Sequence, residues 1–291
     1  WYDKTKIVLK EVLDCGYVAC MNPTAGSFNI TPRMQRHFVT FAVQMPTSDI
    51  VRAMYSQIIE GHIGNFDPEV SKMTSKIVEA TVDLHKQVMN NFLPSAVKFH
   101  YQFNLRDLAN ITQGICRTVK EYYKEPLKVA RLWVHECERV FRDRMVNEAD
   151  MAKFDEFRVG ITKKFFDDCG GLAAIEERPL IYASHASMTY TPEDVPVYNA
   201  IKSYEVLKKT LEDKLSEYNE SNTAMDLVLF QQAMEHITRI ARIIDLPRGN
   251  AMLVGVGGSG KQSLARLASY ICGYEVFQIS VSSTYGVNEF K

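Results

Sequence analysis

The sequence lacks any apolar run near the roughly 20 residues that a helix needs to cross a bilayer. It also lacks the charged start, apolar stretch and small-residue cleavage site of a signal peptide. Neither sign of charge dominates, because 34 Lys and Arg residues oppose 35 Asp and Glu residues, for a net charge of −1. There is thus no general attraction to nucleic acid or to an anionic membrane, and we expect neither as a partner.

Cysteine and histidine spacings typical of metal or redox sites are also absent. The six cysteines are scattered without a Cys-x-x-Cys pair, and the seven histidines show no His-Glu-x-x-His spacing. We interpret the cysteines as reduced core thiols of an intracellular protein. The rest of the composition is ordinary for a globular protein, with 46% apolar and 24% charged residues. The length of 291 residues allows about two domains.

A glycine-rich stretch near the C-terminus is the strongest motif. An apolar run over 251–254 precedes it and a helical pattern over 263–271 follows it. Glycines let successive backbone N–H groups turn toward an anion, and a helix N-terminus adds partial positive charge. Lys261 would reach the outer phosphates. We therefore predict nucleotide binding by a loop that consists of Gly255, Val256, Gly257, Gly258, Ser259, Gly260, Lys261, Gln262 and Ser263.

The loop departs from the usual Gly-x-x-x-x-Gly-Lys-[Ser/Thr] pattern at one position. Gln262 stands where a hydroxyl normally binds Mg²⁺, and Ser263 lies one residue later. An amide oxygen is a poor replacement, so we expect ATP or ADP binding, with Mg²⁺ held through the nucleotide and Ser263 as its candidate ligand. We do not expect hydrolysis at this loop. The alternative is a glycine-rich turn without a ligand, which explains the glycines but not the lysine.

The pattern of apolar residues predicts an α/β plus all-α fold. Near-continuous apolar runs predict strands over 6–9, 16–21, 38–43, 251–254 and 275–281. Helical spacing and caps predict helices over 48–59, 68–92, 105–115, 126–141, 147–168, 199–218 and 224–244, with a short one from Pro32. The predicted domains are the end of one α/β subdomain (1–60), its helical lid (61–175), a proline-containing linker (176–198) and the start of a second α/β subdomain (199–291).

The two ends of the sequence also enter this interpretation. The chain begins at Trp1, without Met, and stops at Lys291, soon after the phosphate loop. A P-loop domain needs further strands after that point to complete its sheet. We therefore expect an internal piece of a longer polypeptide.

Several segments together resemble an axonemal dynein heavy chain. CMNPTAGSF at 20–28 and PRMQRHF at 32–38 are similar to the end of its third AAA+ module, and FHYQFNLRDL at 99–108 resembles the lid of that module. The opening of the fourth module is similar to LVLF at 227–230, PRGN at 247–250 and GVGGSGKQSL at 255–264. The resemblance covers essentially the whole chain, and it implies AAA+ P-loop NTPase modules in tandem.

The resemblance also implies roles for single residues. Asn22 matches sensor 1, which orients the attacking water or senses the γ-phosphate, and Arg106 matches sensor 2. Arg33 and Arg36 flank the arginine-finger position, and we favour Arg36. Without the resemblance the ordinary alternatives are favoured, in which Asn22 caps a turn, Arg33 and Arg36 are solvated surface charges, and Arg106 pairs with a nearby acid. Leu229 and Phe230 match the segment against adenine, where core packing is the ordinary alternative.

The implied function is ATP-driven, minus-end-directed movement on microtubules for ciliary or flagellar beating, with this region mainly a regulatory nucleotide-binding part. Its implied partners are microtubules, bound through other parts of the parent chain, dynein intermediate and light chains, and other axonemal proteins. Its implied location is the cytoplasm and cytoskeleton, in the axoneme. No ATPase site is complete within these residues. The alternatives are a stand-alone P-loop nucleotide-binding or assembly protein, and a nucleic-acid-remodelling AAA+ ATPase, against which the neutral charge argues.

Overall fold

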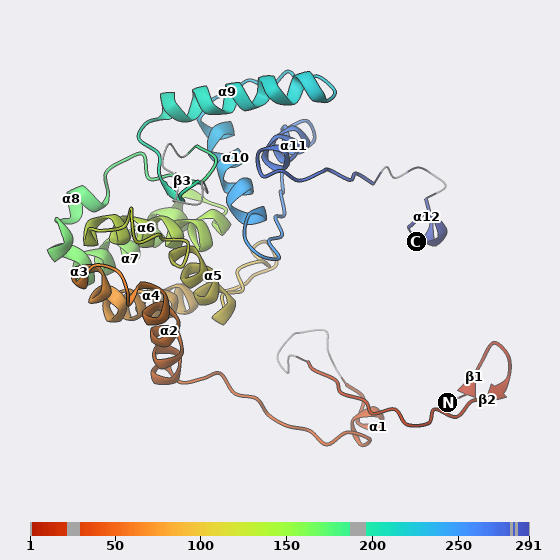
Figure 1. Ribbon diagram of the computed structural model, residues 1–291. Helices are drawn as coiled ribbons and strands as arrows, with labels where there is room; N and C mark the ends of the chain where they lie inside the picture. The colour runs from red at the N-terminus through yellow and green to blue at the C-terminus, as the bar shows by residue number, and fades with distance from the viewer. Residues whose placement is uncertain (1, 22–29, 187–195, 280–281, 283–284, 291) are drawn as a thin grey trace. The chain divides into compact units, whose positions relative to one another are not determined.

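The computed structural model describes residues 2–21, 30–186, 196–279, 282 and 285–290 (Figure 1). The chain divides into two compact units, Trp1–Pro46 and Thr47–Lys291. Each unit is described by itself below.

The first unit contains a short antiparallel hairpin and one short helix. Strand β1 (Tyr2–Asp3) pairs with β2 (Val8–Leu9), which is the last part of the strand predicted over 6–9. Helix α1 (Pro32–Gln35) begins with proline at its first position, as predicted. The strands predicted over 16–21 and 38–43 are wrong for the described residues, which form no ladder there. A strand needs a neighbour for its N–H and C=O groups, and none of the described segments pairs with these two.

The second unit begins with a helical bundle. The helices that the sequence predicts over 48–168 are confirmed, with α2 four residues longer than predicted and the helix over 68–92 divided at Lys72. The bundle consists of α2 (Ser48–Ile63), α3 (Pro68–Ser71), α4 (Met73–Asn91), α5 (Leu105–Ile115), α6 (Pro126–Val140), η1 (Arg142–Arg144), α7 (Glu148–Phe166), η2 (Asp167–Cys169) and α8 (Leu172–Ile175). Its core is apolar and includes Trp133, Phe141, Phe154 and Phe166, all fully buried.

Local sequence signals set where these helices begin. Asn104 caps α5, because its side chain accepts a hydrogen bond from the Arg106 N–H and the Asp107 carboxylate accepts one from the Asn104 N–H at 2.8 Å. This reciprocal capping box satisfies backbone donors that the first turn leaves unpaired. Asn147 caps α7 through its side chain, which accepts a hydrogen bond from the Asp150 N–H at 2.9 Å.

The segment that the sequence presents as a linker is packed where the structure describes it. Strand β3 (Tyr182–Ala183) pairs antiparallel with β4 (Asn199–Ala200). Alternate residues face two different cores: Leu180, Tyr182 and Tyr198 join the core of the bundle, whereas Ile181, Ala183 and Ile201 join a second core. This period of two is that of a strand buried on both faces. The described part of 176–198 therefore joins the two cores instead of running through solvent.

The second core is built by the C-terminal helices. These are α9 (Tyr204–Ser221), α10 (Gln231–Ile244) and α11 (Lys261–Ile271), and the short α12 (Val287–Phe290) follows. Helices α10 and α11 pack together through buried residues such as Ile237, Ala241 and Leu267. The predicted strand at 251–254 does not form, and neither does the one at 275–281 over its described residues. Met252 and Val254 are 88% and 89% exposed, because no neighbouring strand covers them.

Candidate functional site

The phosphate loop has the backbone form that its glycines predict. Residues 255–260 leave the extended segment before them and turn into α11, whose first residue is Lys261. Gly258 and Gly260 both have a φ of 75°, a left-handed conformation that costs a glycine little and other residues more. Gly260 is the N-cap of α11. The loop thus ends directly at the N-terminus of a helix, which is the end that favours an anion.

The Lys261 ammonium lies against the loop. Its Nζ donates hydrogen bonds to the backbone oxygens of Gly255 and Val256 at 2.8 and 2.6 Å, and to Ser259 Oγ at 3.1 Å. A Cβ added at Gly255 would lie 3.2 Å from Ser259 Oγ and 3.6 Å from Lys261 Cδ. A side chain there would press on the Ser259 hydroxyl, whereas it would meet Lys261 only in ordinary van der Waals contact. A Cβ added at Gly257 or Gly258 would meet no described atom within 4 Å.

The residues after the lysine offer little to a metal ion. Gln262 is exposed and Ser263 is half-buried in the first turn of α11, and neither side chain has a hydrogen-bond partner in the described part of the chain. Among the described residues there is also no group of three or more His, Cys, Asp and Glu side chains placed to hold a metal ion. The donor set therefore fits a phosphate well, while for Mg²⁺ it contributes at most the Ser263 hydroxyl and the Gln262 amide.

The segment expected against adenine has one buried and one exposed side chain. Leu229 belongs to the second core, which is the ordinary packing alternative. Phe230 is the N-cap of α10 and is 58% exposed. Of the two, only Phe230 has an aromatic face open to a ligand.

The Arg106 side chain is available to bind a phosphate. Its side chain is exposed and has no hydrogen-bond or ion-pair partner among the described residues. Its neighbour Asp107 is buried and forms an ion pair with Arg144 instead. The alternative in which Arg106 pairs with a nearby acid is therefore not observed.

The remaining predicted site residues belong to the first compact unit. Arg33 lies in α1 and Arg36 is its C-cap, and both are exposed. Arg36 Nε donates a hydrogen bond to His37 Nε2 at 3.3 Å, whereas no hydrogen bond or ion pair joins the Arg33 side chain to a described residue. Asn22 lies outside the described residues. Lys261 and Arg106 belong to the second unit.

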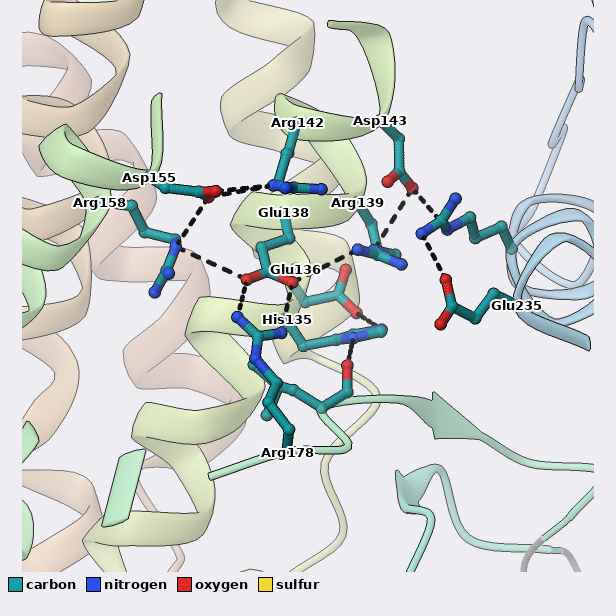
Figure 2. Close-up of polar contacts among 12 residues, drawn as sticks. His135, Glu136, Glu138, Arg139, Arg142, Asp143, Asp155, Arg158, Arg178 and Glu235 are labelled. Atoms are coloured by element: carbon teal, nitrogen blue, oxygen red, sulfur yellow. Dashed lines mark hydrogen bonds and ion pairs between the residues drawn. The ribbon is translucent and has the colours of Figure 1, made fainter. Parts of the chain in front are cut away.

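A buried network of ion pairs on α6 was not predicted. Glu138 lies between three arginines, with Arg178 Nη2 at 2.8 Å, Arg139 Nη2 at 3.4 Å and Arg158 Nε at 3.6 Å (Figure 2). Burial opposes ionisation of Glu138, but the hydrogen bond from Arg178 and the three positive charges outweigh it, so its pKa lies below the ordinary value. The network ties α6 to α7, through Arg158, and to the segment before β3, through Arg178.

The same network reaches α10. Asp143 Oδ2 lies 3.3 Å from Arg139 Nε and 3.6 Å from Arg239 Nε of α10, and Arg239 also pairs with Glu235 (Figure 2). Glu136 pairs with Arg242, one turn further along α10. No sequence signal marks this network, because Arg131, His135, Glu138 and Arg139 recur at helical spacing and have the pattern of an ordinary solvent-facing polar stripe. In the structure Glu136 and Glu138 are buried, so their charges must be paired.

None of the helices in the described part of the chain combines the length and apolarity that a membrane crossing requires.

Family models match three consecutive parts of the chain. A model described as a P-loop containing dynein motor region matches 1–46, an AAA+ lid domain matches 77–174, and a P-loop containing dynein motor region D4 matches 225–291. They support the predicted class of α/β P-loop modules joined by a helical lid.

Three relatives match over the full length of this chain. It is 82% identical to a dynein beta chain of the flagellar outer arm from Chlamydomonas reinhardtii. It is 47% identical to a ciliary dynein beta chain from Tripneustes gratilla and 47% identical to dynein axonemal heavy chain 17 from Homo sapiens. In each case the chain spans 6% of the relative's length. These matches do not favour a stand-alone P-loop protein.

The glycine-rich loop ahead of α11, the helical lid and the order of the matching motor regions lead to one assignment: the chain belongs to the axonemal dynein heavy chain family.

Proposed function

We propose that this chain is part of the motor ring of an axonemal dynein heavy chain, and that its phosphate loop is a regulatory nucleotide site. The observation that carries the proposal is the loop itself, in which two left-handed glycines lead into α11 and the Lys261 ammonium lies against the backbone. The parent chain would be an ATP-driven, minus-end-directed motor on microtubules in cilia or flagella. Intermediate and light chains and other axonemal proteins would be its partners.

The loop has the chemistry to hold ATP or ADP. Backbone N–H groups of 257–261 would face the phosphates, the N-terminus of α11 would add its partial charge, and Lys261 would contribute a full positive charge. To reach the phosphates the ammonium would exchange its hydrogen bonds with Gly255 and Val256 for bonds to phosphate oxygens. Phe230 would lie against the base. Mg²⁺ would come with the nucleotide, with Ser263 as the protein ligand.

Gln262 favours binding over hydrolysis at this loop. An amide has no hydroxyl to give to Mg²⁺, and no acidic cluster among the described residues replaces it. We therefore expect the 291-residue chain alone to hydrolyse ATP no faster than buffer. Phosphate release that disappears in Lys261→Ala would contradict this expectation.

Arg106, Asn22, Arg36 and Arg33 would serve nucleotides held by other parts of the ring. Arg106 would contact the phosphates of its own module from the lid, since its guanidinium is exposed and unpaired among the described residues. Asn22 would act as sensor 1 there. Arg36, or else Arg33, would reach the nucleotide of the preceding module, where arginine's planar fork suits phosphate.

The test is microtubule gliding by the whole heavy chain with Lys261→Ala. We expect gliding to persist but its dependence on ATP concentration to change, because a regulatory site shifts a response without performing the main hydrolysis. Lys208→Ala is the matched control, since Lys208 is an exposed lysine of α9 paired only with Glu212. Unchanged velocity and unchanged ATP dependence in Lys261→Ala would show that the loop is structural.

A further inference from the structure

Glu136 of α6 lies where three other segments meet. It is completely buried. Arg242 of α10 forms an ion pair with Glu136 Oε2, and its Nε donates a hydrogen bond to Oε1 at 3.3 Å. The Tyr198 hydroxyl, from the residue before β4, donates to the same Oε1 at 2.9 Å. Both carboxylate oxygens are therefore held, and the side chain is not free to turn.

The third segment is α5, which approaches Glu136 through Gly114. A Cβ at Gly114 would lie 2.8 Å from Glu136 Cγ and would overlap the carboxylate. Gly114 lies in the last turn of α5, and the buried carboxylate occupies the space where any side chain at 114 would lie.

Another contact joins the ends of α5 and α10. Arg117, just beyond the end of α5, forms an ion pair with Asp245, just beyond the end of α10. Its guanidinium also stacks 4.0 Å from the centre of the Tyr198 ring. The C-terminal end of α10 is thus joined to α6 through Glu136–Arg242 and to the end of α5 through Arg117–Asp245.

The two helices that meet at Glu136 lead to different phosphate-binding groups. Helix α5 begins beside Arg106, the lid arginine. Helix α10 packs along α11, whose first residue is Lys261 of the phosphate loop. Helices move as rigid elements over such lengths, so a displacement of α10 at Arg242 is carried through the second core to α11.

We propose that Glu136 is a positioning residue, which holds α10 against the lid helix α6, where α5 packs on it through Gly114, and thereby sets the nucleotide affinity of the phosphate loop. Gly114 is the residue that makes room for it. This inference rests on the proposed nucleotide binding at Lys261. It names a contact through which the lid of one module acts on the loop of the next.

The test is nucleotide-dependent hydrogen exchange in the whole heavy chain, followed in the peptide that contains 255–263. Titration with ADP gives the concentration at which this peptide is half protected. Gly114→Ala should raise that concentration about tenfold, within the 5- to 150-fold range usual for coupling between sites. Gly160→Ala is the matched control, because Gly160 is a helical glycine of α7 with nothing within 4 Å of its added Cβ. It should leave the midpoint unchanged.

A second variant covers the case in which Gly114→Ala unfolds the lid, which would appear as lost protection of α4 without nucleotide. In that case Arg242→Lys is the deciding variant. Lysine cannot make both of arginine's contacts with Glu136, so this variant should also raise the ADP concentration at half protection. Its control is Arg142→Lys, whose arginine pairs with Asp155 at 3.0 Å and forms no hydrogen bond or ion pair with a described residue of α10. Arg142→Lys should leave the midpoint unchanged.

The outcomes separate the two claims. If the wild-type peptide gains no protection with ADP, or gains it equally in Lys261→Ala, nucleotide binding at the loop is wrong. If wild type is protected, Lys261→Ala is not, and both Gly114→Ala and Arg242→Lys keep the wild-type midpoint within twofold, the positioning role of Glu136 is overturned.

Discussion

Replacing Glu138 by alanine should destabilise the lid more than any loss of a surface charge. Glu138 is buried and is the shared partner of Arg139, Arg158 and Arg178. Its removal leaves Arg139 and Arg158 in the protein interior with one negative charge fewer between them. Burying a charge without compensation is costly, because the protein interior solvates it poorly.

The loss of stability in Glu138→Ala depends on which acidic partners each arginine retains. Removing one partner of a buried pair typically costs 3–5 kcal/mol. Arg178 is 53% exposed and can turn to water, so its loss adds little. Arg158 retains Glu176 and Arg139 retains Asp143. We therefore expect the lower end of the range, about 3 kcal/mol in the free energy of unfolding.

The assay is native-state hydrogen exchange of α6 in the heavy chain, which reports the free energy of opening. Glu212→Ala is the control, because its i,i+4 pair with Lys208 is exposed on both sides and should contribute no more than about 0.5 kcal/mol. The pKa of Glu138 is depressed in the folded state, so its stabilisation is present above its ordinary pKa and is lost as the pH falls through the folded value. The reasoning is refuted if Glu138→Ala costs no more than Glu212→Ala at pH 7.

Two further predictions concern the cap of α5 and the titration of two buried histidines. Asn104→Ala removes the acceptor for the Arg106 N–H and should cost about 1 kcal/mol, seen as faster exchange of the first turn of α5; exchange equal to wild type would contradict the capping box. Burial holds the pKa of His185 at about 4 and lowers that of His135, so the unfolded state binds more protons below pH 6.5 and stability should fall as the pH drops. Between pH 7 and pH 5 the titration of His185 should lower the free energy of unfolding by about 1–2 kcal/mol. The measurement is the free energy of unfolding at the two pH values, and His185→Asn should lose less of it by this amount.

The helices could be predicted because their signals are local. Pro32, Asn104, Pro126 and Asn147 each stand at a helix start, and each cap or proline acts within one turn of the residue that carries it. Apolar spacing then identifies the buried face. The same is true of the phosphate loop, where Gly258 and Gly260 act on their own backbone.

The strands and the buried ion network depend on partners far away in sequence. The runs at 38–43 and 251–254 have strand composition, but composition alone supplies no neighbour to pair with. Glu136 and Arg242 are far apart along the chain, and neither shows by itself that it is buried. The segment after Ile175 reads as a linker from its prolines and polar residues, while the alternation of Tyr182 and Ala183 between two cores emerges only once both cores exist.

The most direct test of the account is an electron cryomicroscopy map of the whole heavy chain at saturating ADP. The account predicts density for a diphosphate at residues 255–263, with Lys261 Nζ turned from the Gly255 and Val256 oxygens to the β-phosphate. A map in which other phosphate loops of the ring hold ADP while this loop does not, with Lys261 still bonded to its own backbone, would contradict it.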